Sequence, residues 1–374
     1  INGSQLYAVA SELQAGQTHY YSVNDGGIRG NNYTNNGATG TNSMAAGVGA
    51  TASALNTTAI GHLANASANN ATAVGNNTEA SFKDAVAIGE SAKATADSTV
   101  ALGKNANACS EYAVSIGLDS QASGNGAVSL GSGAVASARS ATAIGNDAQA
   151  SVQRATAVGN LANASEEDAA AFGRLAHASA NRALALGSES NALNANDVAL
   201  GAGSVTAAAV PTNSATDGDV TYNGFAGTAP NSTVSIGSAG NERTLTNVAA
   251  GRIQADSTDA INGSQLYAVA NKPITFSGDS GGDVDRILGQ KLEINGGATG
   301  ELSNNNIGVV ANGTDTLNIQ LAKELTDLTS AQFVDAAGNS TTVGGNGINI
   351  TPANGTPVSL SENGLNNGGN VISG

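Results

Sequence analysis

The stretch Ala85–Ala108, "AVAIGESAKATADSTVALGKNANA", contains one pattern twice and decides the fold. In both Val86–Gly89 and Val100–Gly103, a β-branched residue, a small residue and a bulky apolar residue lead into a glycine. That glycine returns at every fourteenth position, as Gly61, Gly75, Gly89, Gly103, Gly117, Gly131, Gly145, Gly159, Gly173, Gly187 and Gly201. A fixed short period of this kind marks one structural unit used many times in a row.

Two columns of larger residues accompany the glycines. The column three positions before each glycine holds Thr58, Thr72, Val86, Val100, Val114, Val128, Thr142, Thr156, Ala170, Leu184 and Val198. Between this column and the bulky residue before each glycine there is always Ala or Ser. Alternation of larger and tiny residues has a period of two, which predicts a strand whose two faces differ.

Each unit also holds a second small-residue segment, because alanine returns five residues after most of the glycines, as at Ala66 and Ala80. Two short strands and two turns use up fourteen residues, so each unit is predicted to be one coil of a parallel β-solenoid. Gly47 and Ala52 are expected to begin the stack as an atypical first coil.

A coil this thin, lined by Ala and Ser, buries little apolar area, so the bulky column is expected on its outside. Left in water, each large side chain would forgo roughly 1.5–3 kcal/mol. We therefore expect the column to be an interface that identical chains close around an axis. The expected core residues of that interface are Ile60, Val74, Ile88, Leu102, Ile116, Leu130, Ile144, Val158, Phe172, Leu186 and Leu200.

These repeats resemble the head repeats of the trimeric autotransporter adhesins of the Yersinia adhesin type. The resemblance implies a mainly β fold in which a left-handed parallel β-roll packs as a homotrimer. It further implies a neck with a short coiled-coil helix, and then a β-prism domain in which the three chains interleave their strands.

A second signal is the decapeptide "INGSQLYAVA", which occurs at Ile1–Ala10 and again at Ile261–Ala270. The segment Asn241–Asn271 is similar to the family's neck, and the first copy is expected to be the remnant of a preceding neck whose helix ends near Gly16. Asp256, Ser257 and Thr258 are expected to cap the second helix, and Pro273 to stop it. The expected structural residues of the neck are Arg243, Arg252, Asp256, Asp259, Ile261, Leu266 and Val269.

These signals divide the chain into six parts. The expected parts are the end of a neck at 1–16, a connector at 17–45, the β-roll head at 46–205, a strand-rich connector at 206–240, a neck at 241–271 and a β-prism-type head domain at 272–374. We expect any export signal or membrane anchor to lie outside this fragment, since no segment has the pattern of either.

No residue pattern points to catalysis, a cofactor or a metal. His19, His62 and His177 are far apart, and Cys109 takes a slot normally held by Ser or Thr. Asp279, Asp283 and Asp285 miss the spacing of a calcium loop and are expected to be a polar turn. The charged turn residues Lys83, Asp84, Arg154, Glu166 to Asp168 and Arg182 are expected to form a solvated rim, with ion pairs between neighbouring chains.

The sequence thus predicts a surface adhesin segment and no enzyme. The net charge of −15 argues against nucleic acid as a partner. The resemblance implies a bacterial cell-surface location, and attachment to cells or to matrix proteins such as collagen, fibronectin and laminin, with autoaggregation and biofilm formation. An alternative is a structural spacer that presents a binding tip located elsewhere. A polysaccharide-cleaving enzyme on a β-helix is disfavoured, because clustered acids and bases are missing.

Overall fold

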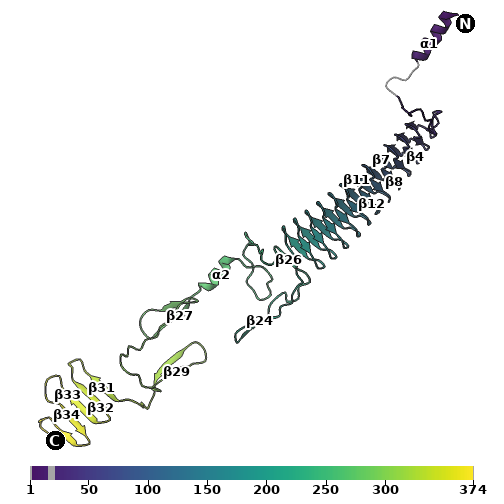
Figure 1. Ribbon diagram of the computed structural model, residues 1–374. Coiled ribbons are helices and arrows are strands. Elements are labelled where there is room, and N and C mark those ends of the chain that lie inside the picture. The colour runs from purple at the N-terminus through teal and green to yellow at the C-terminus, as the bar shows by residue number, and fades with distance from the viewer. Residues whose placement is uncertain (1, 16–21, 374) are drawn as a thin grey trace. The chain divides into compact units, whose positions relative to one another are not determined.

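A computed structural model describes residues 2–15 and 22–373 of the chain. It divides into two compact units, Ile1–Ala268 and Val269–Gly374. Strands dominate both units. The helices in the described part of the chain are α1, Gly3–Ala15, and α2, Gly263–Ala270 (Figure 1).

The first unit contains a stack of strands in two parallel sheets (Figure 1). We call the sheet with three-residue strands the apolar sheet, after its outer side chains. Its strands are β1 Met44–Ala46, β3 Thr58–Ile60, β5 Thr72–Val74, β7 Val86–Ile88, β9 Val100–Leu102, β11 Val114–Ile116, β13 Val128–Leu130, β15 Thr142–Ile144, β17 Thr156–Val158, β19 Ala170–Phe172, β21 Leu184–Leu186, β23 Val198–Leu200 and the two-residue β26 Val234–Ser235.

The other sheet has two-residue strands, and we call it the polar sheet. Its strands are β2 Thr51–Ala52, β4 Asn65–Ala66, β6 Glu79–Ala80, β8 Lys93–Ala94, β10 Asn107–Ala108, β12 Gln121–Ala122, β14 Val135–Ala136, β16 Gln149–Ala150, β18 Asn163–Ala164, β20 His177–Ala178 and β22 Asn191–Ala192.

The register of both sheets advances by one coil at a time. Ile88 pairs with Leu102 in the apolar sheet, and Lys93 pairs with Asn107 in the polar sheet, both in parallel. Met44–Ala46 already pairs with Thr58–Ile60, so the stack includes the coil that contains Gly47. The predicted parallel β-solenoid with fourteen-residue coils is therefore confirmed.

The lumen of the coil is filled by small side chains. Alanines such as Ala87, Ala94 and Ala101 are fully buried and form one continuous core. Where a hydroxyl takes an inward position it is bonded inside: Thr99 Oγ1 donates to the Ala96 carbonyl at 2.7 Å, and Ser115 and Ser120 pair at 2.8 Å. Because so little fits inside, the larger residues of each strand point outward.

The repeated glycine is required by how closely the coils approach one another. Gly117 has φ +137°, and a Cβ there would lie 2.4 Å from the carbonyl oxygen of Gly131 in the next coil. An L-residue is both strained in this backbone region and excluded by its neighbour. The repeated glycine of each coil therefore packs directly against the repeated glycine of the next coil.

Both ends of the stack depart from the repeat. At the start, the Asn32 amide donates to the Gly47 carbonyl at 2.7 Å and accepts from the Gly49 N–H at 2.7 Å. At the end, Val198 pairs with Val234, so thirty-six residues separate two strands that elsewhere lie fourteen apart. The extra length contains an antiparallel hairpin of β24, Ser214–Asp217, and β25, Val220–Asn223.

The two copies of the decapeptide form the same helix start. Asn2 and Gln5 bond each other reciprocally at 2.9 and 3.0 Å, and Asn262 and Gln265 do so at 3.2 and 3.3 Å. This is a capping box built on Asn and Gln.

The prediction that Asp256, Ser257 and Thr258 cap the second helix is wrong. They lie in a turn several residues before α2, and the cap is Asn262. The first helix, α1, is described from Gly3 to Ala15, and its expected end near Gly16 lies outside the described residues.

The second unit is made of antiparallel strands. Two hairpins pair β27 Ile274–Phe276 with β28 Val284–Arg286, and β29 Ile307–Ala311 with β30 Leu317–Leu321. A five-stranded sheet follows, in chain order, with β31 Ser330–Val334, β32 Ser340–Gly344, β33 Gly347–Thr351, β34 Val358–Ser361 and β35 Gly364–Asn366.

Replacing Gly117 with Ala is expected to destabilise the roll by about 2–4 kcal/mol, from backbone strain and the clash with Gly131. Thermal unfolding followed by circular dichroism would measure this. Gly126→Asn is the control, because Gly126 has φ +65° with open space around it and Asn stands at the same slot in other coils. Equal stability of both variants would contradict the packing argument.

Deleting one fourteen-residue coil, residues 118–131, is expected to leave the roll folded, because every remaining strand keeps its register. Deleting seven residues, 118–124, brings polar-sheet residues opposite apolar-sheet residues and is expected to unfold the neighbouring coils. Hydrogen exchange across the roll distinguishes the two. Similar protection in both deletions would argue against the solenoid register.

Candidate assembly surface

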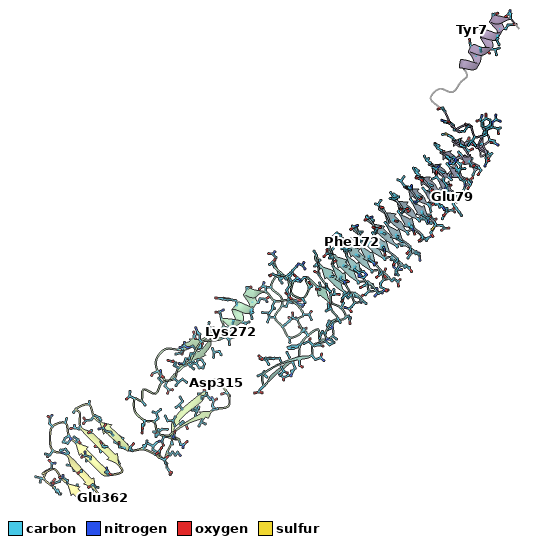
Figure 2. The ribbon with its side chains drawn as sticks, viewed as in Figure 1. Tyr7, Glu79, Phe172, Lys272, Asp315 and Glu362 are labelled. Atoms are coloured by element: carbon cyan, nitrogen blue, oxygen red, sulfur yellow. The ribbon has the colours of Figure 1, made fainter. Side chains whose placement is uncertain are left out.

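The apolar sheet exposes one straight column of bulky side chains. Its members are stacked residue on residue by the ladder, as Ile116 on Leu130 and Leu130 on Ile144. Ile88, Leu102, Leu130, Leu186 and Leu200 are 38–43% exposed. The other expected interface residues are half-buried in one chain, namely Ile60, Val74, Ile116, Ile144, Val158 and Phe172 (Figure 2 labels Phe172). The structure thus brings all eleven onto one outer face.

The parallel column three residues before each glycine lies on the same face, because residues two apart in a strand share a side. It is half-buried throughout, as at Val86, Val100 and Val114. The apolar band is therefore two side chains wide in most coils, and its second column is Thr at Thr58, Thr72, Thr142 and Thr156. A contiguous band of this kind marks an interaction site.

The polar sheet presents the opposite chemistry. Its outer column reads Thr51, Asn65, Glu79, Lys93, Asn107, Gln121, Val135, Gln149, Asn163, His177 and Asn191. A hollow of about 370 Å³ on this face is lined by Asn77, Ser91, Lys93, Asn105, Asn107, Asp119 and Gln121. The roll thus has one face suited to burial and another suited to hydrated contacts.

The charged turn residues pair along the chain, from one coil to the next. Arg154 contacts the Asp168 carboxylate at 2.5 and 2.9 Å and Glu167 at 2.5 Å, and the Arg154 guanidinium lowers the pKa of Asp168. Lys104 pairs with Glu90 at 3.0 Å. The expectation placed such ion pairs between neighbouring chains, whereas these pairs form within one chain, where they align successive coils.

The charged residues expected in the neck have different partners. Arg252 and Asp259 form a two-pronged ion pair at 2.7 and 3.0 Å, and the Arg252 guanidinium lowers the pKa of Asp259. Asp256 accepts a hydrogen bond from Gln254 and is not among the partners of an arginine. Arg243 reaches back to the roll, where it bonds Ser204 Oγ at 3.0 Å.

Sequence reasoning missed Gln265 and Asp197. Gln265 bonds both backbone polar groups of Gly251, at 3.0 and 2.7 Å, and so ties the loop before α2 to that helix. Asp197 is fully buried and accepts from the Thr233 N–H at 2.8 Å. Burial on its own raises the pKa of Asp197, but hydrogen bonds led by the one from Thr233 outweigh it and lower the pKa. Other coils hold Ala or Thr at the inward-facing position of Asp197, so a charged residue at that position could have been noticed in the sequence.

Both helices expose their apolar side chains. Ile261, Leu266 and Val269 are 58–65% exposed, and Leu6 and Tyr7 of α1 are exposed as well (Figure 2 labels Tyr7). Most of the stability of a helix comes from packing of its apolar face, and these side chains lie exposed in the single chain.

The sheets of the second unit also have uncovered apolar faces. In the five-stranded sheet the register places Ala331, Phe333, Val343, Ile348, Ile350, Val358, Leu360 and Leu365 on one face. In the β29–β30 hairpin one face holds Ile307, Val309, Ala311, Leu317, Ile319 and Leu321, and all but Ala311 are among the exposed large apolar residues. These faces, like the roll, present surfaces for a partner chain.

Other chemistry is sparse in the described residues. Cys109 is an exposed free thiol, His62 contacts Asn76, and His19 lies outside the described residues. Asp285 and Asp283 accept hydrogen bonds from Thr275 and Ser277 across the β27–β28 hairpin, both at 2.6 Å. Within residues 2–15 and 22–373, no three His, Cys, Asp or Glu side chains gather as metal ligands. None of the described helices could cross a membrane.

Comparison with protein families yields two related matches. The family model described as the coiled stalk of trimeric autotransporter adhesin matches residues 1–29 and 244–283, which include both decapeptides. The YadA head domain repeat matches overlapping segments between residues 38 and 204. Together the matched segments cover more than half of the chain.

Individual relatives agree with the family models. The autotransporter adhesin BtaE of Brucella suis biovar 1 (strain 1330) is 59% identical over 68 residues, which are 18% of this chain and 9% of that adhesin. The chain therefore spans a small part of that protein.

Two solved structures are also similar. The C-terminal YadA-like domain of a Burkholderia pseudomallei protein is 58% identical over 24% of this chain and 42% of its own, with a TM-score of 0.23. The collagen-binding domain of the Yersinia adhesin YadA is 26% identical over 55% of this chain and 85% of its own, with a TM-score of 0.29. These TM-scores are too low to carry the fold, which rests on the register described above. By its two family models, the chain belongs to the trimeric autotransporter adhesins.

Proposed function

We propose that this chain is a passenger segment of a bacterial surface adhesin, closed into a homotrimer by its apolar faces and attached to host matrix or cells by its polar face. The observation that carries the proposal is the apolar band along the roll, set opposite a polar sheet. The same surface is proposed to support autoaggregation and biofilm formation.

The trimer supplies the interior that one coil lacks. The exposed members of the apolar band are already partly covered by their own neighbours, so burying the remainder gains roughly 1 kcal/mol per coil. Repeated over the length of the roll, this is enough to make assembly and folding a single process. The expected core residues, from Ile60 to Leu200, are proposed to meet around the axis, and the neck residues to hold the three chains as they converge.

The same logic extends beyond the roll. The uncovered face of the β31–β35 sheet and that of the β29–β30 hairpin are proposed to pack against their copies, as the expected β-prism does. The proposed parts keep the boundaries 1–16, 17–45, 46–205, 206–240, 241–271 and 272–374.

Attachment is assigned to the polar sheet, because assembly through the other sheet leaves this one in water. Its outer column carries an amide or hydroxyl in most coils, and a shallow hollow lies over part of it, which suits many weak contacts with a long ligand. Collagen, fibronectin and laminin are the matrix ligands that the family implies. The proposed location is the bacterial cell surface, with attachment to the outer membrane through another part of the full protein.

Replacing both Ile88 and Ile116 with Asp is expected to abolish the trimer, because six charges would be buried without partners around the axis. Sedimentation velocity is expected to show aggregates or unfolded monomer. The control is the same charge on the other face, Gln121→Asp, which is expected to keep the trimer mass. A folded Ile88→Asp, Ile116→Asp trimer would show that the band faces elsewhere.

The purified trimer is expected to bind surfaces coated with at least one of collagen, fibronectin and laminin. Combining Lys93→Ala, Asn107→Ala and Gln121→Ala is expected to weaken that binding by roughly tenfold or more through lost repeated contacts. Asn125→Ala, in the adjacent turn, is the control. A folded trimer that binds none of the three matrices and no cells would favour the structural spacer instead.

A further inference from the structure

The last coil of the roll is followed by a single strand and not by a complete coil. After Gly201 the chain leaves the repeat, and the next strand of the apolar sheet is β26, thirty-six residues after β23 rather than fourteen. Backbone groups that a following coil would satisfy are therefore left at the turn that contains Gly201. An open solenoid end is a site for unwanted strand addition unless it is covered.

Interior coils show what is missing. The residue after each glycine accepts a hydrogen bond from the next coil, as the His62 carbonyl does from the Asn77 N–H at 2.8 Å. The residue before each glycine does likewise, as Ile60 does from the Gly75 N–H at 2.7 Å. The corresponding carbonyls of the last coil belong to Ala202 and Leu200.

Side chains supply both missing donors. The Arg243 guanidinium donates to the Ala202 carbonyl, and Ser204 Oγ donates to the Leu200 carbonyl at 2.8 Å. The guanidinium also takes the missing coil's place in space. A Cβ on Gly187 would meet the backbone of Gly201, and a Cβ on Gly201 would meet Arg243 Nη1 at 3.4 Å.

The same guanidinium holds the neck's first residues to the roll. It donates to the Ile236 carbonyl at 2.5 Å and to Ser204 Oγ at 3.0 Å, so it joins the segment after β26 to the last turn. The Val205 N–H donates to the Gly237 carbonyl at 2.9 Å beside it. On the other side of the coil, Asp197 fixes Thr233 just before β26.

We propose that Arg243 is a latch that ends the roll and joins it to the neck by replacing the backbone of the absent next coil. Arg243 and Asp197 hold the chain to the roll on either side of the inserted segment 206–232. The neck therefore connects to the roll directly, and the β24–β25 hairpin takes no part in that connection. This role goes beyond ligand attachment and does not depend on which ligand is bound.

The test is hydrogen exchange on the whole chain carrying Arg243→Ala. The Val205 amide, and the Val198 amide that donates to Thr233, are expected to exchange about tenfold faster or more, as for loss of charged hydrogen bonds. Mid-roll amides such as Val114 are expected to keep their protection and report that the roll is folded. Arg243→Lys keeps the positive charge but loses the planar guanidinium that donates several hydrogen bonds at once. Its exchange rates are expected to lie between those of the unmodified chain and of Arg243→Ala.

Arg174→Ala is the matched control. Arg174 directly follows Gly173, as Ala202 directly follows Gly201, so it holds the same position two coils earlier. Its side chain pairs with the exposed Glu189. It is expected to leave Val198 and Val205 protected. Unchanged exchange at both amides in Arg243→Ala, or an effect equal to that of Arg174→Ala, would overturn the latch.

A second variant tests the bracketed insertion. The Thr212 N–H donates to the Thr228 carbonyl at 3.1 Å, so residues 213–227 can be replaced by two glycines without stretching the chain. Protection at Val205 is expected to survive, and its loss would contradict the proposal. Should Arg243→Ala unfold the roll, Arg243→Lys decides by the same amides. Sedimentation mass is measured in parallel, so loss of the trimer is distinguished from loss of the latch.

Discussion

The narrowness of the coil is the constraint on which the rest of the structure depends. Two sheets lie so close that only Ala, Ser and Thr, with one bonded Asp, fit between them, and a Cβ on the repeated glycines would overlap the backbone of the next turn. Such an interior buries little apolar surface. Every residue large enough to contribute more is turned outward, so stability depends on surface that a single chain cannot cover.

Polar groups on the outside serve the same stack. Coil-to-coil pairs such as Arg154 with Asp168, and the amide ladder of Asn56, Asn70 and Asp84, repeat the step of fourteen and reward correct register. At the two ends, Asn32 and Arg243 provide the acceptor and donors that absent coils would provide. The repeat itself contains no stop signal, so these two residues mark where the roll begins and ends.

The solenoid and its outward column could be predicted from the sequence, because a strict period leaves one geometry for Gly61 to Gly201. The helix cap was misread: Asp256 and Ser257 are common capping residues, but the cap is Asn262, and its box with Gln265 repeats that of Asn2 with Gln5 in the first decapeptide. Arg243 was recognised as structural, yet two of its three partners are main-chain carbonyls, which no side-chain pattern reveals. The pair of Arg154 with Asp168 follows the step of fourteen, but pairing within one chain was not expected from the sequence.

Each backbone hydrogen bond in the roll either closes a turn within one coil, as from the Ala64 N–H to the Gly61 carbonyl, or joins a residue to the coil above or below. Recombination between repeats in a gene of this kind adds or removes whole coils without creating a misfit anywhere else. The length of the roll can therefore change by whole coils, while the two ends, capped by Asn32 and Arg243 from outside the repeat, stay the same.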